Sequence, residues 1–89
     1  MERRFIVTTE AGLHARPAGQ FVQMAARFHA KVGIANVSIG RGPASARSIL
    51  AILTLGVRQG HEVLLSAEGD DAEAALDALC GLLAGESPG

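Results

Sequence analysis

His14 and Arg16 are the residues of this 89-residue chain whose types and spacing best suit a chemical step. They lie in the segment Gly12–Ala18, which reads GLHARPA. A neutral imidazole is a nucleophile, and an arginine two residues later supplies a permanent cation that can bind a phosphate group through two N–H donors. The spacing therefore suggests a histidine that accepts and releases a phosphoryl group.

The residues after His14 support this interpretation, because they are predicted to begin a helix. If His14 is the N-cap, the backbone N–H groups of Ala15 and Arg16 have no partner within the helix and favour an anion. Pro17 is tolerated in this first turn, where its missing N–H would have had no partner. The helix dipole and Arg16 also disfavour a proton on the imidazole. A histidine that only caps the helix, beside a surface arginine, is the alternative.

The elements that must position these residues follow from the periodicity of apolar side chains. Alternation predicts four strands, over residues 3–9, 31–39, 44–46 and 62–67. A change of phase predicts a bulge near Ala35-Asn36, and Pro43 favours an edge position for the third strand. Helical spacing predicts helices over residues 15–28, 49–55 and 72–83. The order βαββαβα indicates an α+β fold, an open-faced two-layer sandwich of a four-stranded antiparallel sheet with three helices on one face.

Length and composition indicate one domain over residues 1–89, with a frayed tail at 85–89. No apolar run reaches the ~20 residues of a membrane span, and the start of the chain lacks the pattern of a secretory signal. Cys80 is the single cysteine, expected in the core, so an internal disulfide and a multi-cysteine zinc site are excluded. His29 and His61 are interpreted as a solvated and a loop histidine. We expect a cytoplasmic protein without metal, cofactor or membrane insertion, and the 3% aromatic content disfavours nucleic-acid binding.

Charge is distributed unevenly along the chain. All eight basic residues lie before residue 59, whereas seven of the nine acidic residues lie after residue 58. Such asymmetry is consistent with an anionic ligand or acidic partner on one side of the molecule. A fold that mixes the two halves in space is the alternative.

The segment Gly12–Ala18 resembles, without a mismatch, the active-site signature of the HPr family, the histidine-containing phosphocarriers of the bacterial phosphoenolpyruvate:sugar phosphotransferase system. A second block, Ala46–Leu50 with Leu53–Gly56 and Gln59-Gly60, resembles the serine-site helix of that family. The likeness covers nearly the whole chain, and the family fold has the order βαββαβα. One departure is a few additional residues between the two motifs, in the Val37–Pro43 region, which leaves the second hairpin undetermined.

The resemblance implies a carrier rather than an enzyme. His14 would accept a phosphoryl group on Nδ1 from phosphorylated enzyme I and pass it to sugar-specific IIA domains, while Arg16 holds the group. Ser48 would match the serine that a kinase phosphorylates, and a phosphorylase restores, in some lineages; a plain helix N-cap is the alternative. The protein is expected to be a monomer.

A partner surface is expected beside His14. Ile49 and Ile52 are available for burial, which leaves Leu50 and Leu53 as candidates for an exposed apolar patch; the alternative is that both leucines belong to the core. The partner-binding candidates are Gln20, Gln23, Arg27, Arg47, Leu50 and Leu53.

Two further functions stay open. One is a regulatory or nitrogen-related relay module that binds partner proteins according to its phosphorylation state. The other is a small-ligand-binding sandwich that is not phosphorylated.

Overall fold

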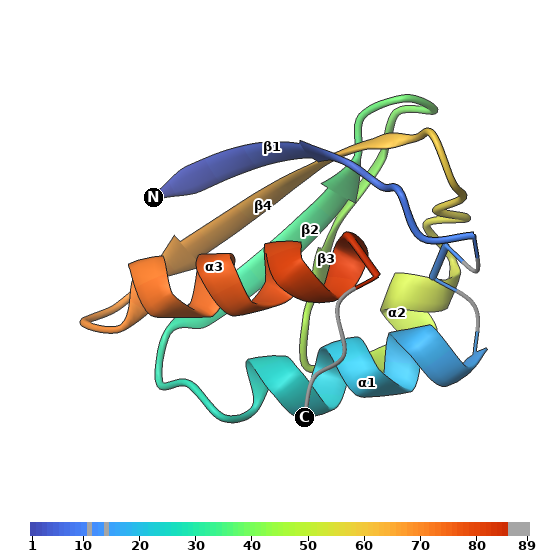
Figure 1. The fold of residues 1–89 in the computed structure, drawn as a ribbon. Helices are drawn as coiled ribbons and strands as arrows, with labels where there is room; N and C mark the ends of the chain where they lie inside the picture. The colour runs from blue at the N-terminus through green and yellow to red at the C-terminus, as the bar shows by residue number, and fades with distance from the viewer. Residues whose placement is uncertain (11, 14, 86–89) are drawn as a thin grey trace.

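A computed structural model describes residues 1–10, 12–13 and 15–85 of the chain (Figure 1). His14, the predicted phosphorylation residue, lies outside the described residues, as do Ala11 and residues 86–89 of the predicted tail. The elements are β1 (Glu2–Ile6), α1 (Ala15–Ala25), β2 (Lys31–Asn36), β3 (Arg41–Ser45), α2 (Ile49–Leu53), β4 (Glu62–Glu68) and α3 (Ala72–Leu83). The predicted order βαββαβα is confirmed.

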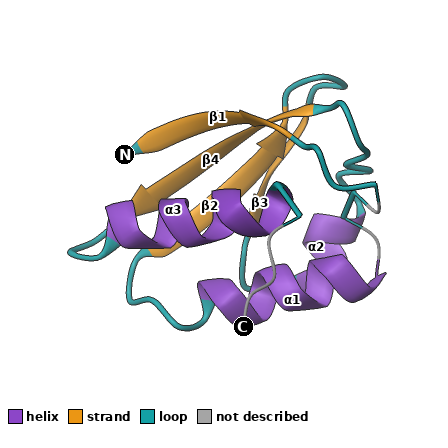
Figure 2. Ribbon diagram, viewed as in Figure 1, coloured by secondary structure: helices purple, strands orange, loops and turns teal. Residues whose placement is uncertain are grey.

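The four strands form one antiparallel sheet in the order β1-β4-β2-β3. The three helices cover one face of this sheet and leave the other face open (Figures 1 and 2). The predicted open-faced α+β sandwich is therefore confirmed. β3 lies at an edge, as Pro43 predicted, because a residue without a backbone N–H is tolerated where no further strand pairs.

Apolar periodicity places the core between the sheet and the helices. Val63, Leu65 and Ala67 of β4 are buried, and the residues between them are only half-buried. The predicted stripe of the last helix is buried throughout: Ala72, Ala75, Leu76, Leu79, Cys80 and Leu83. Phe21 of α1 is fully buried, which contributes about 2–3 kcal/mol of hydrophobic stabilisation.

Several predicted boundaries are wrong by a few residues. β1 ends at Ile6 rather than Thr9, β3 begins at Arg41 rather than Ala44, and the helical segments of α1 and α2 are shorter than predicted. β2 ends at Asn36 rather than Ile39 because the N–H groups of Val37 and Ser38 both donate to the carbonyl of Glu62, which turns the chain away. The predicted irregularity is confirmed as a register shift between Ile34 and Asn36.

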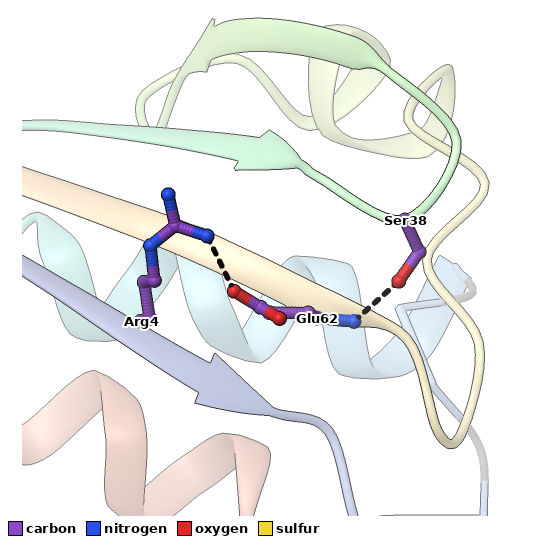
Figure 3. Close-up of polar contacts among 3 residues, drawn as sticks. All are labelled: Arg4, Ser38 and Glu62. Carbon is purple, nitrogen blue, oxygen red and sulfur yellow. Dashed lines mark hydrogen bonds and ion pairs between the residues drawn. The ribbon is translucent and has the colours of Figure 1, made fainter.

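The two halves of the charge distribution meet at β1. Arg4 donates to the carboxylate of Glu62 at 2.7 Å, and the backbone N–H of Glu62 donates to Ser38 Oγ at 2.8 Å (Figure 3). Arg3 pairs in the same way with Asp77 of α3. The fold thus mixes the two halves at these pairs, which are exposed enough to contribute little to stability.

Within the described part of the chain, none of the helices has the length and apolar character needed to cross a lipid bilayer.

Candidate functional site

Gly12 and Leu13, the residues directly before His14, are buried and fixed to the segment that follows α2. The N–H of Leu13 donates to the carbonyl of Val57 at 3.0 Å. Gly12 has φ +58°, and a Cβ atom added to it would lie 2.5 Å from the carbonyl oxygen of Val57 and 2.9 Å from Cα of Arg58. Only glycine fits this approach, which explains the glycine of the signature.

The helix start after His14 has the features that a phosphoryl site needs. α1 begins at Ala15, so the first-turn N–H groups of Ala15 and Arg16 have no intrahelical partners, as predicted. Arg16 is exposed, and among the described residues it takes part in no ion pair. Ala18, one turn on, is fully buried and fixes the helix against the core. The contact between Arg16 and His14, and the phosphate-binding role of Ala15 and Arg16, stay predictions.

Ser48 begins α2, as predicted. Its Oγ accepts a hydrogen bond from the N–H of Ala51 at 3.2 Å, which is the geometry of an N-cap. The hydroxyl of Ser45, three residues earlier, accepts from the N–H of Arg47 at 3.2 Å and does not cap α2. The capping role is confirmed, and phosphorylation of Ser48 stays a prediction.

The apolar surface of α2 differs from the prediction. Leu50 is 74% exposed, as expected, and Ile52 is fully buried. Ile49, expected inside, is 39% exposed because its side chain lies over Gly19 of α1, which has no side chain to cover it. Leu53, expected outside, is half-buried against the core. Leu50 and Ile49 therefore form the exposed apolar surface of this helix.

The polar candidates lie on α1, in the turn that follows it and in the turn that precedes α2. Gln20 is half-buried, whereas Gln23, Arg27 and Arg47 are exposed. Arg16 lies in the first turn of α1, whose 11 residues span about 16 Å, whereas Arg27 lies two residues beyond the end of this helix. Arg27, a candidate for the partner surface expected beside His14, therefore does not lie beside Arg16.

The described residues whose pKa values are shifted lie away from the start of α1. Hydrogen bonds from the N–H groups of His29 and Ala30 lower the pKa of Asp71. Burial raises the pKa of the Cys80 thiol, which keeps it protonated and unreactive, in agreement with its predicted place in the core.

Asn36 and His61 form a polar contact that sequence reasoning missed. Asn36 is fully buried, and its Nδ2 lies 3.0 Å from the carbonyl oxygen of Leu55 and 3.1 Å from Nδ1 of His61. The one available signal was an asparagine at the point where the alternation of a strand changes phase. His61, interpreted as a plain loop residue, is its half-buried partner.

Comparison with known proteins finds a matching family model and several relatives. Residues 1–85 match the family model described as the PTS HPr component phosphorylation site. The chain is 51% identical over 83 residues to the phosphocarrier protein HPr of Haloferax volcanii, covering 89% of this chain and 88% of that protein. It is 37% identical over 79 residues to the multiphosphoryl transfer protein of Salmonella typhimurium, covering 89% of this chain but only 21% of that longer protein.

The fold also resembles that of a solved structure. The crystal structure of a phosphocarrier protein HPr from Bacillus anthracis superposes with a TM-score of 0.85 at 39% sequence identity, covering 92% of this chain and 94% of that one.

Proposed function

The chain belongs to the HPr family of the phosphotransferase system, and from this we propose that it carries a phosphoryl group on His14 from phosphorylated enzyme I to sugar-specific IIA domains. The observation that carries the proposal is the anchored loop at Gly12 and Leu13, which leads directly into the histidine and then into a helix start with the exposed cation Arg16.

The proposed transfer is a reversible displacement at phosphorus. A lone pair on the neutral imidazole of His14 attacks the phosphorus, the bond between phosphorus and the donor atom of enzyme I breaks, and the donor keeps that electron pair. Transfer to a IIA domain repeats the step with His14 as the leaving group. Because the protein does little covalent chemistry in such a reaction, catalysis depends on placement and on stabilising negative charge.

Arg16 and the first turn of α1 would supply that stabilisation. The guanidinium can donate two parallel hydrogen bonds to phosphoryl oxygens. The unpartnered N–H groups of Ala15 and Arg16, at the positive end of the helix dipole, add donors on the same side. The two backbone N–H groups need no rearrangement during transfer, because the helix already fixes their orientation.

Partners would dock over α1 and α2. The exposed side chains of Leu50 and Ile49 give an apolar centre, Gln20 and Gln23 lie on α1, and Arg47 lies in the turn before α2. An apolar centre with a polar rim is typical of protein–protein interfaces. Arg27, beyond the C-terminal end of α1, would lie at the margin of such an interface.

The experiment that tests the function is incubation with enzyme I and labelled phosphoenolpyruvate. We expect acid-labile, base-stable label on the protein and none on the His14→Ala variant. A known HPr labelled in the same tube shows that the enzyme I is active. No label on the wild-type chain under those conditions would overturn the proposal, and label passed only to nitrogen-related partners would favour the alternative relay.

A further inference from the structure

We propose that Asn36 and His61 are positioning residues for phosphoryl transfer, because together they hold the loop on which the residues before His14 rest. This loop consists of residues 55–61, between α2 and β4, and is called the 55–61 loop below. The proposal rests on the proposed function, since it concerns how the same histidine is placed.

The 55–61 loop supports both ends of the segment that leads from β1 to His14. At the near end, the N–H of Gly60 donates to the carbonyl of Val7 at 2.8 Å, and the side chain of Gln59 donates to the carbonyl of Thr8 at 3.1 Å. At the far end, Val57 accepts from Leu13. Figure 1 shows the blue segment after β1 running beside the yellow segment between α2 and β4. Displacement of the loop would therefore displace Leu13, which is covalently bonded to His14.

Asn36 ties the first residue of this loop to the last. Its amide nitrogen carries two hydrogens, enough to serve both the carbonyl oxygen of Leu55 and Nδ1 of His61. The opposite orientation of the amide would place Oδ1 against the Leu55 oxygen, where two acceptors would repel each other. The nitrogen must therefore face the loop, and one buried side chain fixes both of its ends.

The ring of His61 accepts at Nδ1. The backbone N–H of Arg58 points at Nδ1 from 3.2 Å, and a backbone N–H can only donate. Nδ1 therefore acts as the acceptor in both contacts, and the N–H of Arg58 and the amide of Asn36 share its single lone pair. The N–H of His61 in turn donates to the carbonyl of Arg58 at 3.0 Å. The ring and the backbone of His61 therefore both bond to Arg58, and Asn36 contacts the same turn through the His61 ring.

The energetics of Asn36 favour a positioning role over a purely stabilising one. Its Oδ1 is buried and has no hydrogen-bond partner among the described residues. A buried acceptor without a partner lowers stability, which offsets part of what the hydrogen bonds donated by Nδ2 contribute. The asparagine instead fixes the carbonyl of Leu55 and the ring of His61 relative to each other, which an apolar side chain would not do. Transfer rates depend strongly on such placement.

The test uses full-length variants that separate the contact from general stability. His61→Phe keeps a ring but removes the acceptor, and His61→Asn restores an acceptor oxygen near the position of Nδ1. The control is Leu79→Val, a fully buried residue of α3 whose truncation lowers stability without touching the loop. All variants are compared at a temperature at which each is folded. Denaturant is added to the more stable proteins until all have the same free energy of unfolding.

Two measurements are made on each variant. The first is hydrogen exchange of the Leu13 amide, which reports opening of its bond to Val57 and needs no partner protein. The second is the rate of phosphoryl transfer from phosphoenolpyruvate through enzyme I. We expect His61→Phe to raise the exchange rate and lower the transfer rate by tenfold or more, His61→Asn to restore both substantially, and Leu79→Val at matched stability to leave both unchanged.

Three results would decide against the proposal. Unchanged Leu13 exchange in His61→Phe would show that the ring does not hold the loop. If His61→Phe and Leu79→Val slow transfer equally, His61 has only a structural role. The same conclusion follows if His61→Asn transfers no faster than His61→Phe. If His61→Phe does not fold, Asn36→Ser, which shortens the donor and keeps the ring, is measured in its place. A wild-type protein that takes no label is a failure of the proposed function, and Leu13 exchange then still decides whether Asn36 and His61 hold the loop.

Discussion

Gly12 combines two constraints at one residue, a left-handed backbone and a backbone neighbour with no room for a side chain. Gly40 has a similar φ of +66° but nothing within 4 Å of the position of a Cβ. The two glycines therefore separate the cost of backbone strain from the cost of the contact with Val57.

We predict that Gly40→Ala destabilises the fold by about 1 kcal/mol, the strain of a left-handed alanine. Gly12→Ala is expected to cost about 1–3 kcal/mol more, because the new methyl group displaces Val57, and to slow phosphoryl transfer as well. Urea unfolding measures the first effect and labelling through enzyme I the second. Equal stabilities of the two variants would show that the loop yields to the methyl group without strain.

Sequence reasoning at the residue scale succeeded where function depends on neighbours in the chain. The signature predicted Arg16 at an exposed helix start because helix capping and charge are local properties. Asn36 and His61 could not be found in this way. Their contact joins two elements, and each residue alone is typical of a loop or a strand end.

Asp71 shows how one side chain can join two elements. It precedes α3, yet its carboxylate makes no capping bond to its own helix. Instead it accepts from the N–H groups of His29 and Ala30, each at 2.8 Å, in the turn between α1 and β2. These bonds favour the charged carboxylate, which is why the pKa of Asp71 is lowered from its ordinary value of 3.8.

A lowered carboxyl pKa fixes the sign of a pH dependence. The stabilisation by Asp71 is present in full above the ordinary pKa of 3.8 and is lost as the pH falls through the lower pKa of the folded state. We predict that Asp71→Asn lowers the Tm at neutral pH and that the difference from the wild type narrows below about pH 4. Asp70→Asn, at the exposed neighbour, is the control with no expected difference. A gap in Tm that stays constant through acid pH would show that the charge on Asp71 is not what joins the elements.

Periodicity predicted which helices and strands form and in what order. It did not predict which side chains of α2 are buried. A helix of five residues turns little more than once, so periodicity barely constrains which side faces the core. The actual choice depends on Gly19 of the neighbouring helix, which leaves Ile49 uncovered. The end of β2 was misjudged for a related reason, because the carbonyl of Glu62 that turns the chain comes from a distant strand.

Over the whole molecule, the charge asymmetry of the sequence is partly neutralised. Arg3 and Arg4 pair with acids of the second half, whereas Arg16 and Arg47 stay exposed at the α1 and α2 surface. The net charge of −1 therefore describes the proposed partner surface poorly. A locally basic surface speeds encounter with an acidic partner and does so less at high salt.

We predict that raising NaCl from about 0.05 M to about 0.5 M slows phosphoryl transfer from enzyme I about tenfold. The Tm should change little, because exposed ion pairs contribute little to stability. Arg47→Gln is expected to reduce the salt dependence, whereas Lys31→Gln, which removes the same charge from an exposed position on β2, should not. Identical salt dependence of both variants would place the electrostatic attraction elsewhere on the molecule.

The strand order has a consequence for how the chain is made. Among the described strands β1 pairs with β4 alone, so that Glu2 lies opposite Ser66, and β4 also separates β1 from β2. During synthesis the first strand therefore has no partner until most of the chain has left the ribosome. The β2–β3 hairpin can form early. The full sheet forms late and in one step, when β4 pairs with both β1 and β2. A ribosome-bound chain that stops before residue 62 would remain sensitive to proteases, however well its first helix forms.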